Sequence, residues 1–165
     1  MNPRRHDISQ AGFTLLAALA ALFFMALATQ QVMAVVSLQA QREREAELIH
    51  IGVAYRQAIG RYYEAAPGSQ KTWPPTLEAL LDDQRSVTLK RHLRRIYADP
   101  ITREAKWGIV LAPGGGIVGV FSLSDAAPVR AGGRELEEAG LGAASQYRDW
   151  KFVYQPVAGE PSSGG

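Results

Sequence analysis

The chain has 165 residues and a formal net charge of +2, from 18 lysines and arginines against 16 aspartates and glutamates. This balance gives no general reason to expect a nucleic-acid-binding protein, and the length suits one small domain besides a leader and an anchor. Cysteine is absent, so disulfides and cysteine-type zinc sites are excluded from the chain.

An apolar run dominates the N-terminal part of the sequence. Residues 8–41 include no charged side chain, and most of residues 13–38 are Phe, Leu, Ala, Val or Met. About 20 apolar residues are enough for a helix to cross the bilayer core. Arg4 and Arg5 precede the run, and short basic flanks stay on the cytoplasmic side of a membrane. We therefore expect a single-pass anchor whose leader, residues 1–12, is cytoplasmic and whose C-terminal part is exported.

The residues before the run indicate how the leader is removed. An ordinary secretory signal carries its small-residue cleavage site after the apolar core, whereas here Ala11-Gly12 stands before it. Cleavage at this point would keep the apolar helix on the mature protein. The sequence Gly12-Phe13-Thr14-Leu15 and the helix after it resemble the prepilin-type signal of type IV pilins and type II secretion pseudopilins. The alternative is an uncleaved signal anchor.

The resemblance implies specific roles for these residues. A prepilin peptidase would cut after Gly12 and methylate the new N-terminal residue, Phe13. Ala17 departs from the family, which usually has glutamate at the fifth mature position, where the carboxylate pairs with the terminal amine of a neighbouring subunit. Such a loss is typical of a minor subunit at the filament tip. Assembly would then use the first mature residues, Phe13, Thr14, Leu15, Leu16 and Ala17.

The helix is expected to continue through residues 42–66, because the first clear stop is Pro67-Gly68. An apolar stripe recurs there at alternating spacings of four and three, formed by Leu48, Gly52, Tyr55, Ile59 and Tyr62. Polar residues are predicted to lie elsewhere on the helix surface, namely Arg42, Glu45, Arg56, Gln57, Arg61 and Glu64. The stripe predicts packing against a sheet formed later in the chain. Gly52 and Gly60 indicate close approach or a bend.

Two short helices are predicted after a loop at residues 67–75. Thr76 can cap the first, which contains Leu77, Leu80 and Leu81. The second would direct Leu89, Leu93 and Ile96 inward and most of the basic side chains outward. The basic cluster consists of Arg85, Lys90, Arg91, Arg94 and Arg95. It is either a binding patch for DNA, anionic lipid or an acidic partner, or a solvated helix face. The absence of aromatic residues among the bases favours the solvated face.

Strand signals follow at residues 107–111, 117–123 and 150–154, which are rich in β-branched and aromatic residues. The glycine-rich stretch 113–116 favours a hairpin turn between the first two, not a phosphate-binding loop, because a strand and not a helix comes next. Residues 124–148 are predicted to be a long loop with a short helix near 134–139.

The long loop also carries carboxylates. Major pseudopilins bind calcium in a comparable region, so the resemblance makes Asp125 and Asp149 candidate calcium ligands. A solvated loop is the alternative, because calcium requires six or more oxygen ligands. His6, His50 and His92 are scattered along the sequence, and no nucleophile, base and orienting group occur together. The sequence therefore does not indicate an enzyme, and it identifies no other cofactor.

These observations predict an α+β fold of the pilin-like type: a long N-terminal helix, first transmembrane and then amphipathic, packed on a small antiparallel sheet of about three strands. The expected segments are a cleaved leader, a membrane and filament-core helix, an amphipathic helix, a periplasmic domain and a flexible tail, at residues 1–12, 13–41, 42–66, 67–158 and 159–165.

The expected function is that of a structural subunit of a type II secretion or type IV pilus filament, held in the bacterial inner membrane. Its expected partners are prepilin peptidase, other pilin or pseudopilin subunits, the inner-membrane assembly platform and membrane lipid. The alternative is a membrane-tethered minor pilin that acts as a binding module for DNA or exported cargo, although the composition does not favour nucleic acid.

Overall fold

The computed structural model divides the chain into two compact units, Met1–Gln41 and Arg42–Gly165. Within helices, the side chains of residues 8–11 and 28–35 are not described. Residues 1–7 of the expected leader lie outside the described residues, and so does the whole expected tail, residues 159–165. The structure describes residues 8–67, 71–86, 89–130 and 132–156.

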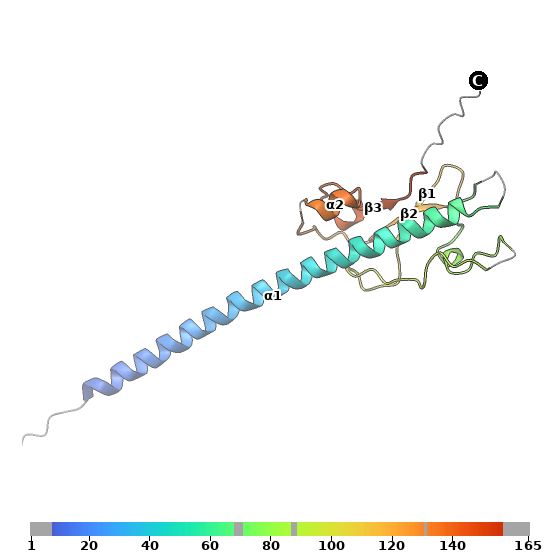
Figure 1. Cartoon of the computed structure of the whole chain (residues 1–165). Helices are drawn as coiled ribbons and strands as arrows, with labels where there is room; N and C mark the ends of the chain where they lie inside the picture. Colours follow the sequence, from blue (N-terminus) through green and yellow to red (C-terminus); the bar gives the residue numbers. More distant parts are fainter. Residues whose placement is uncertain (1–7, 68–70, 87–88, 131, 157–165) are drawn as a thin grey trace, which may run out of the picture. The chain divides into compact units, whose positions relative to one another are not determined.

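One long helix, α1, extends over Ile8–Glu64 and has 57 residues (Figure 1). It begins five residues before Phe13 and ends two residues before Ala66, close to the stop predicted at Pro67. The predicted continuous N-terminal helix is therefore confirmed. Its last turn is closed by the backbone amide of Ala65, which donates to the carbonyl of Arg61 at 2.9 Å.

A three-stranded antiparallel sheet lies in the second unit, in the order β1-β2-β3. Strand β1 is Gly108–Leu111, β2 is Ile117–Phe121 and β3 is Lys151–Val153. Each strand falls within a segment that the sequence predicted as a strand. The α+β class and the three-stranded antiparallel sheet are thus confirmed.

The apolar stripe of α1 forms the centre of the core. Leu48, Tyr55 and Ile59 are completely buried, and Tyr62 is 5 % exposed. A Cβ added at Gly52 would lie 2.4 Å from ring atoms of Phe152 in β3, so the helix backbone touches that aromatic ring. Gly60 makes room for the Tyr154 ring in the same way. The glycines therefore mark close approach, and the predicted partner of the stripe, the sheet, is confirmed.

Replacement of Gly52 by valine should destabilise the second unit. The added side chain overlaps the Phe152 ring, and overpacking of this kind lowers the free energy of unfolding by roughly 1–3 kcal/mol. Urea unfolding followed by tryptophan fluorescence measures the loss. Gln57→Val is the matched control, because Gln57 is exposed on the same helix. Equal unfolding midpoints for the two variants would contradict the packing described here.

The segment between α1 and β1 differs from the prediction. A single 3₁₀ turn, η1, covers Glu78–Leu80, and its N-cap is Leu77 without a side-chain cap, so the cap predicted at Thr76 is wrong. The second predicted helix, around residues 89–96, does not form. Instead the amides of His92 and Leu93 both donate to the Leu80 carbonyl, at 2.8 and 2.9 Å. These long-range bonds replace the local bonds that a helix would need.

The remaining elements agree with the predicted loops. Residues 112–116 form the β1–β2 turn, in which Gly115 and Gly116 have φ values of 87° and 81°. Glycine adopts this conformation without the strain that other residues incur. The predicted short helix in the long loop is α2, Arg134–Glu138. A 3₁₀ turn, η2, at Tyr147–Asp149 leads into β3.

Candidate functional site

The predicted processing segment lies within α1 and is open on all described sides. A Cβ added at Gly12 would meet no atom within 4 Å. The next large side chains are also exposed, with relative accessibilities of 75 % for Phe13, 65 % for Leu15 and 71 % for Leu16. Ala17 is exposed as well and carries no carboxylate. Nothing in the described part of the chain covers these residues, so a second molecule can reach them.

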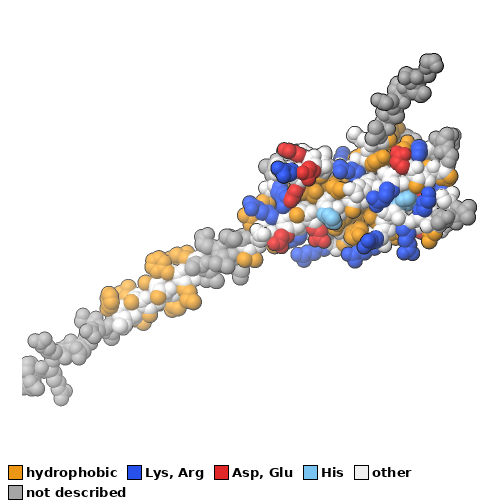
Figure 2. Space-filling model, in the orientation of Figure 1, with side chains coloured by type: hydrophobic (Ala, Val, Ile, Leu, Met, Phe, Trp, Pro, Cys, Tyr) orange, Lys and Arg blue, Asp and Glu red, His pale blue; other side chains and the backbone are white. Residues whose placement is uncertain are grey.

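Exposed apolar side chains continue along the N-terminal half of α1, where Figure 2 shows them as a band of orange atoms. They include Leu19, Leu22, Phe23, Phe24, Met25, Leu27, Val36 and Leu38, all more than 40 % exposed. Because successive residues turn by about 100° around a helix, these side chains point to several sides and form no single stripe. A helix that is apolar all round is stable only inside a protein core or a lipid layer.

Arg85 belongs to a buried cluster and not to a solvated basic patch. It donates to both carboxylate oxygens of Asp83 at 2.8 Å and to the Tyr62 carbonyl at 2.6 Å. His92 Nε2 lies 3.0 Å from the same carboxylate, and Asp83 and His92 are 2 % and 7 % exposed. Hydrogen bonds from Arg85 hold the pKa of Asp83 well below its usual range. The sequence placed Arg85 with the exposed bases, and that grouping is wrong.

The other four bases, Lys90, Arg91, Arg94 and Arg95, are exposed. The Arg95 guanidinium lies 5.1 Å from the centroid of the Tyr97 ring, which is a cation–π distance. All four bases extend from an irregular segment, whereas the sequence predicted that they lie on one face of a helix.

The candidate calcium ligands have other partners. An Asp125 carboxylate oxygen lies 2.7 Å from an Arg148 nitrogen, and Asp149 accepts a hydrogen bond from the Gln146 amide at 3.0 Å. Among the described residues no group of three or more His, Asp or Glu side chains could hold a metal ion.

Glu45 is a residue that the sequence analysis assigned to the helix surface, and this assignment is wrong. Its side chain is completely buried. Oε1 accepts hydrogen bonds from the Tyr147 hydroxyl at 2.7 Å and from the Val129 amide at 2.5 Å, and Arg130 Nε lies 3.7 Å from Oε2. Glu45 therefore fastens the long loop to α1. Glu45 lies three residues before Leu48, so it continues the four-and-three spacing of the apolar stripe. This spacing could have predicted its burial from the sequence.

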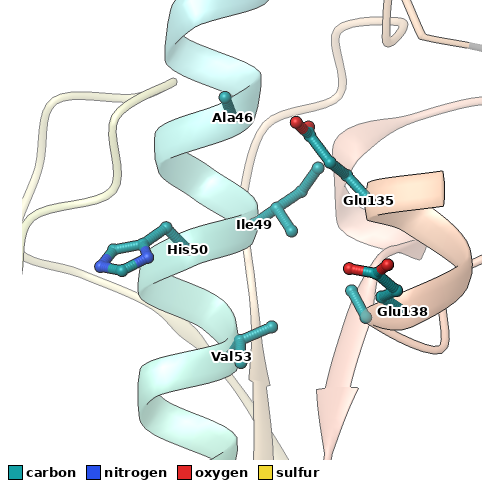
Figure 3. A pocket seen from close by; sticks show the side chains of 7 residues that line it. Ala46, Ile49, His50, Val53, Glu135 and Glu138 are labelled. Carbon is teal, nitrogen blue, oxygen red and sulfur yellow. The ribbon is translucent and has the colours of Figure 1, made fainter. Parts of the chain in front are cut away.

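A groove of about 380 Å³ lies between α1 and α2. Ala46, Ile49 and Val53 of α1 supply its apolar floor, and Glu135 and Glu138 of α2 stand beside it with their carboxylates directed towards α1 (Figure 3). Arg130 forms an ion pair with Glu135. Glu138 forms no ion pair among the described residues, so its charge is available at the rim.

Two further findings bear on function. Within the part of the chain that the structure describes, no helix meets the length and apolarity needed for a membrane crossing. Comparisons with protein-family models, with curated proteins and with solved structures find no match.

Proposed function

We propose that the chain is a pilin-like structural subunit of a type II secretion or type IV pilus filament, processed after Gly12 and assembled through the apolar part of α1. The observation that carries the proposal is the exposed apolar surface that begins at Phe13, directly after Gly12 and inside one continuous helix. Such a surface needs lipid or other apolar helices around it.

Three features support this proposal together. The Gly12-Phe13-Thr14-Leu15 sequence stands at the start of the apolar surface, where a prepilin-type signal would place it. Residues 13–38 form an apolar run that would hold the subunit in the bacterial inner membrane before assembly. The second half of α1 packs on a small antiparallel sheet, which would form the periplasmic domain.

The proposed partners follow from the same surfaces. Prepilin peptidase would act at Gly12 and methylate Phe13, while the inner-membrane assembly platform and sister subunits would contact the apolar helix. Ala17 offers no carboxylate to the terminal amine of a neighbour. The subunit therefore fits a minor position in the filament better than the repeating one, since apolar packing alone must hold its N-terminus.

The predicted processing site can be tested by replacing Gly12 with leucine in cells that contain an active prepilin peptidase. A peptidase site that accepts a residue without a side chain should reject the isobutyl group, so the precursor should accumulate. Leucine keeps the helix apolar, so the variant should remain in the membrane fraction. Ser9→Leu is the control for a bulky residue in the leader. Processing of Gly12→Leu at the wild-type extent, read by immunoblot and N-terminal sequencing, would refute the assignment.

A further inference from the structure

The second unit carries an exposed leucine among bases, and this feature complements the groove between α1 and α2. The sequence predicted that Leu89 points inward, and this prediction is wrong, because Leu89 is 58 % exposed. In the described part of this unit the other exposed large apolar residues are Ile109 and Leu111, which belong to β1. Leu89 is followed at once by the exposed bases Lys90 and Arg91, with Arg94 close by in the sequence. These three bases form no ion pair among the described residues. The segment thus presents one apolar side chain surrounded by positive charge.

The groove presents the opposite pattern. Its floor of Ala46, Ile49 and Val53 is apolar, and the carboxylate of Glu138 stands at its rim. A buried apolar contact surrounded by opposite charges is the usual arrangement of a specific protein interface, in which the charges set orientation and the apolar centre supplies affinity.

We propose that the α1–α2 groove of one copy of this chain receives the Leu89–Arg94 segment, residues 89–94, of a second copy. Leu89 enters the apolar floor, and the flanking bases face Glu138. The occupant is a second copy because the same chain carries both the acidic apolar groove and the basic apolar segment.

The two surfaces lie on different sides of the molecule. In Figure 1, α2 lies on one side of α1, and the yellow-green segment that contains residues 89–94 lies on the other. Each copy would therefore insert its 89–94 segment into one neighbour and accept the segment of another neighbour in its own groove. Such a contact, between two different surfaces, is heterologous. Contacts of this kind propagate into open, helical assemblies unless a rotation closes them into a ring. The inference rests on the proposed filament role for its biological use, but the contact itself can be measured separately.

Disulfide crosslinking tests the contact, because the chain has no native cysteine. The full chain carrying both Ala46→Cys and Leu89→Cys, oxidised mildly in detergent micelles, should give a ladder of oligomers that reductant removes. A mixture of the two single variants should give dimers only. The control pair is Ala46→Cys with Ala105→Cys, because Ala105 is exposed and lies outside both surfaces. Equal crosslinking by the control pair overturns the proposal.

Charge reversal tests the electrostatic part. Glu138→Lys in the cysteine pair should lower the crosslinked fraction about threefold, as expected for loss of an exposed ion pair, whereas Glu104→Lys, an exposed control, should not. An unchanged fraction in Glu138→Lys overturns the proposal. So does a loss of duplex DNA binding on Arg91→Glu with unchanged crosslinking, since the segment would then be a nucleic-acid surface. If the crosslinks form as expected but the protein from cells with an active prepilin peptidase still carries residues 1–12, the contact between copies stands and the pilin-like function is rejected.

Discussion

Two arginines in the middle of the apolar run, Phe23→Arg and Leu27→Arg, should remove most of the chain from the membrane fraction. Both wild-type side chains are exposed, at 62 % and 44 %, and the proposed membrane anchoring would place them in lipid. An arginine at the centre of a membrane helix costs about 3 kcal/mol for insertion, so the pair should cost about 6 kcal/mol. This cost exceeds the expected effect of every other substitution considered for this protein.

The measurement is the share of the chain that resists alkaline extraction from membranes. Phe23→Leu with Leu27→Val is the matched control, because it changes shape at the same positions and keeps them apolar. Wild-type retention of the arginine variant would show that residues 13–38 do not sit in lipid. Protease resistance of the second unit, equal in all three proteins, would show that the arginines act on the apolar helix alone.

The second large effect is expected at Asp83, where an uncharged asparagine should lower the free energy of unfolding by about 3 kcal/mol. Asparagine keeps the shape of the side chain but leaves the buried Arg85 contact without its opposite charge. His92, which lies against the same carboxylate, loses a charged partner as well. Urea unfolding at neutral pH measures this difference. Asp82→Asn is the control, since Asp82 is its exposed neighbour in the sequence.

The pH dependence follows from the depressed pKa of Asp83 in the folded state. An ordinary aspartate in the unfolded chain has a pKa of about 3.9. Because the folded chain holds the carboxylate ionised to lower pH, the stabilisation is fully present above about pH 4 and declines as the pH falls from there towards the folded-state pKa. The gap between wild type and Asp83→Asn should therefore narrow in acid. A gap that stays constant from neutral pH to about pH 3 would mean that the Asp83 charge is not the source.

The elements that could be predicted from the sequence are those that leave a local pattern. The four-and-three spacing of Leu48, Tyr55 and Ile59 reports burial of one helix face, and that burial is what the structure has. Segments rich in β-branched and aromatic residues predicted the three strands, because such residues favour a pleated, half-buried backbone. The prediction of a second short helix was wrong because the backbone amides of His92 and Leu93 donate to the Leu80 carbonyl and not to carbonyls one helical turn earlier. No local sequence pattern indicates these longer-range hydrogen bonds.

The buried polar contacts could not be predicted in the same way, because their partners are distant in the sequence. Ser122 donates to Asp99 at 2.6 Å across 23 residues, and Tyr147 donates to Glu45 across 102 residues. Composition and spacing contain no information about such pairs. The processing segment is a different case, because Gly12 and Phe13 were chosen from a motif, and the structure adds their exposure.

The most direct test of the pilin-like assignment is the intact mass of the protein purified from membranes of cells with an active prepilin peptidase. The account predicts a chain that has lost residues 1–12 and carries one added methyl group on Phe13. A mass that still includes the leader, or one that places the new N-terminus after the apolar run, would contradict it.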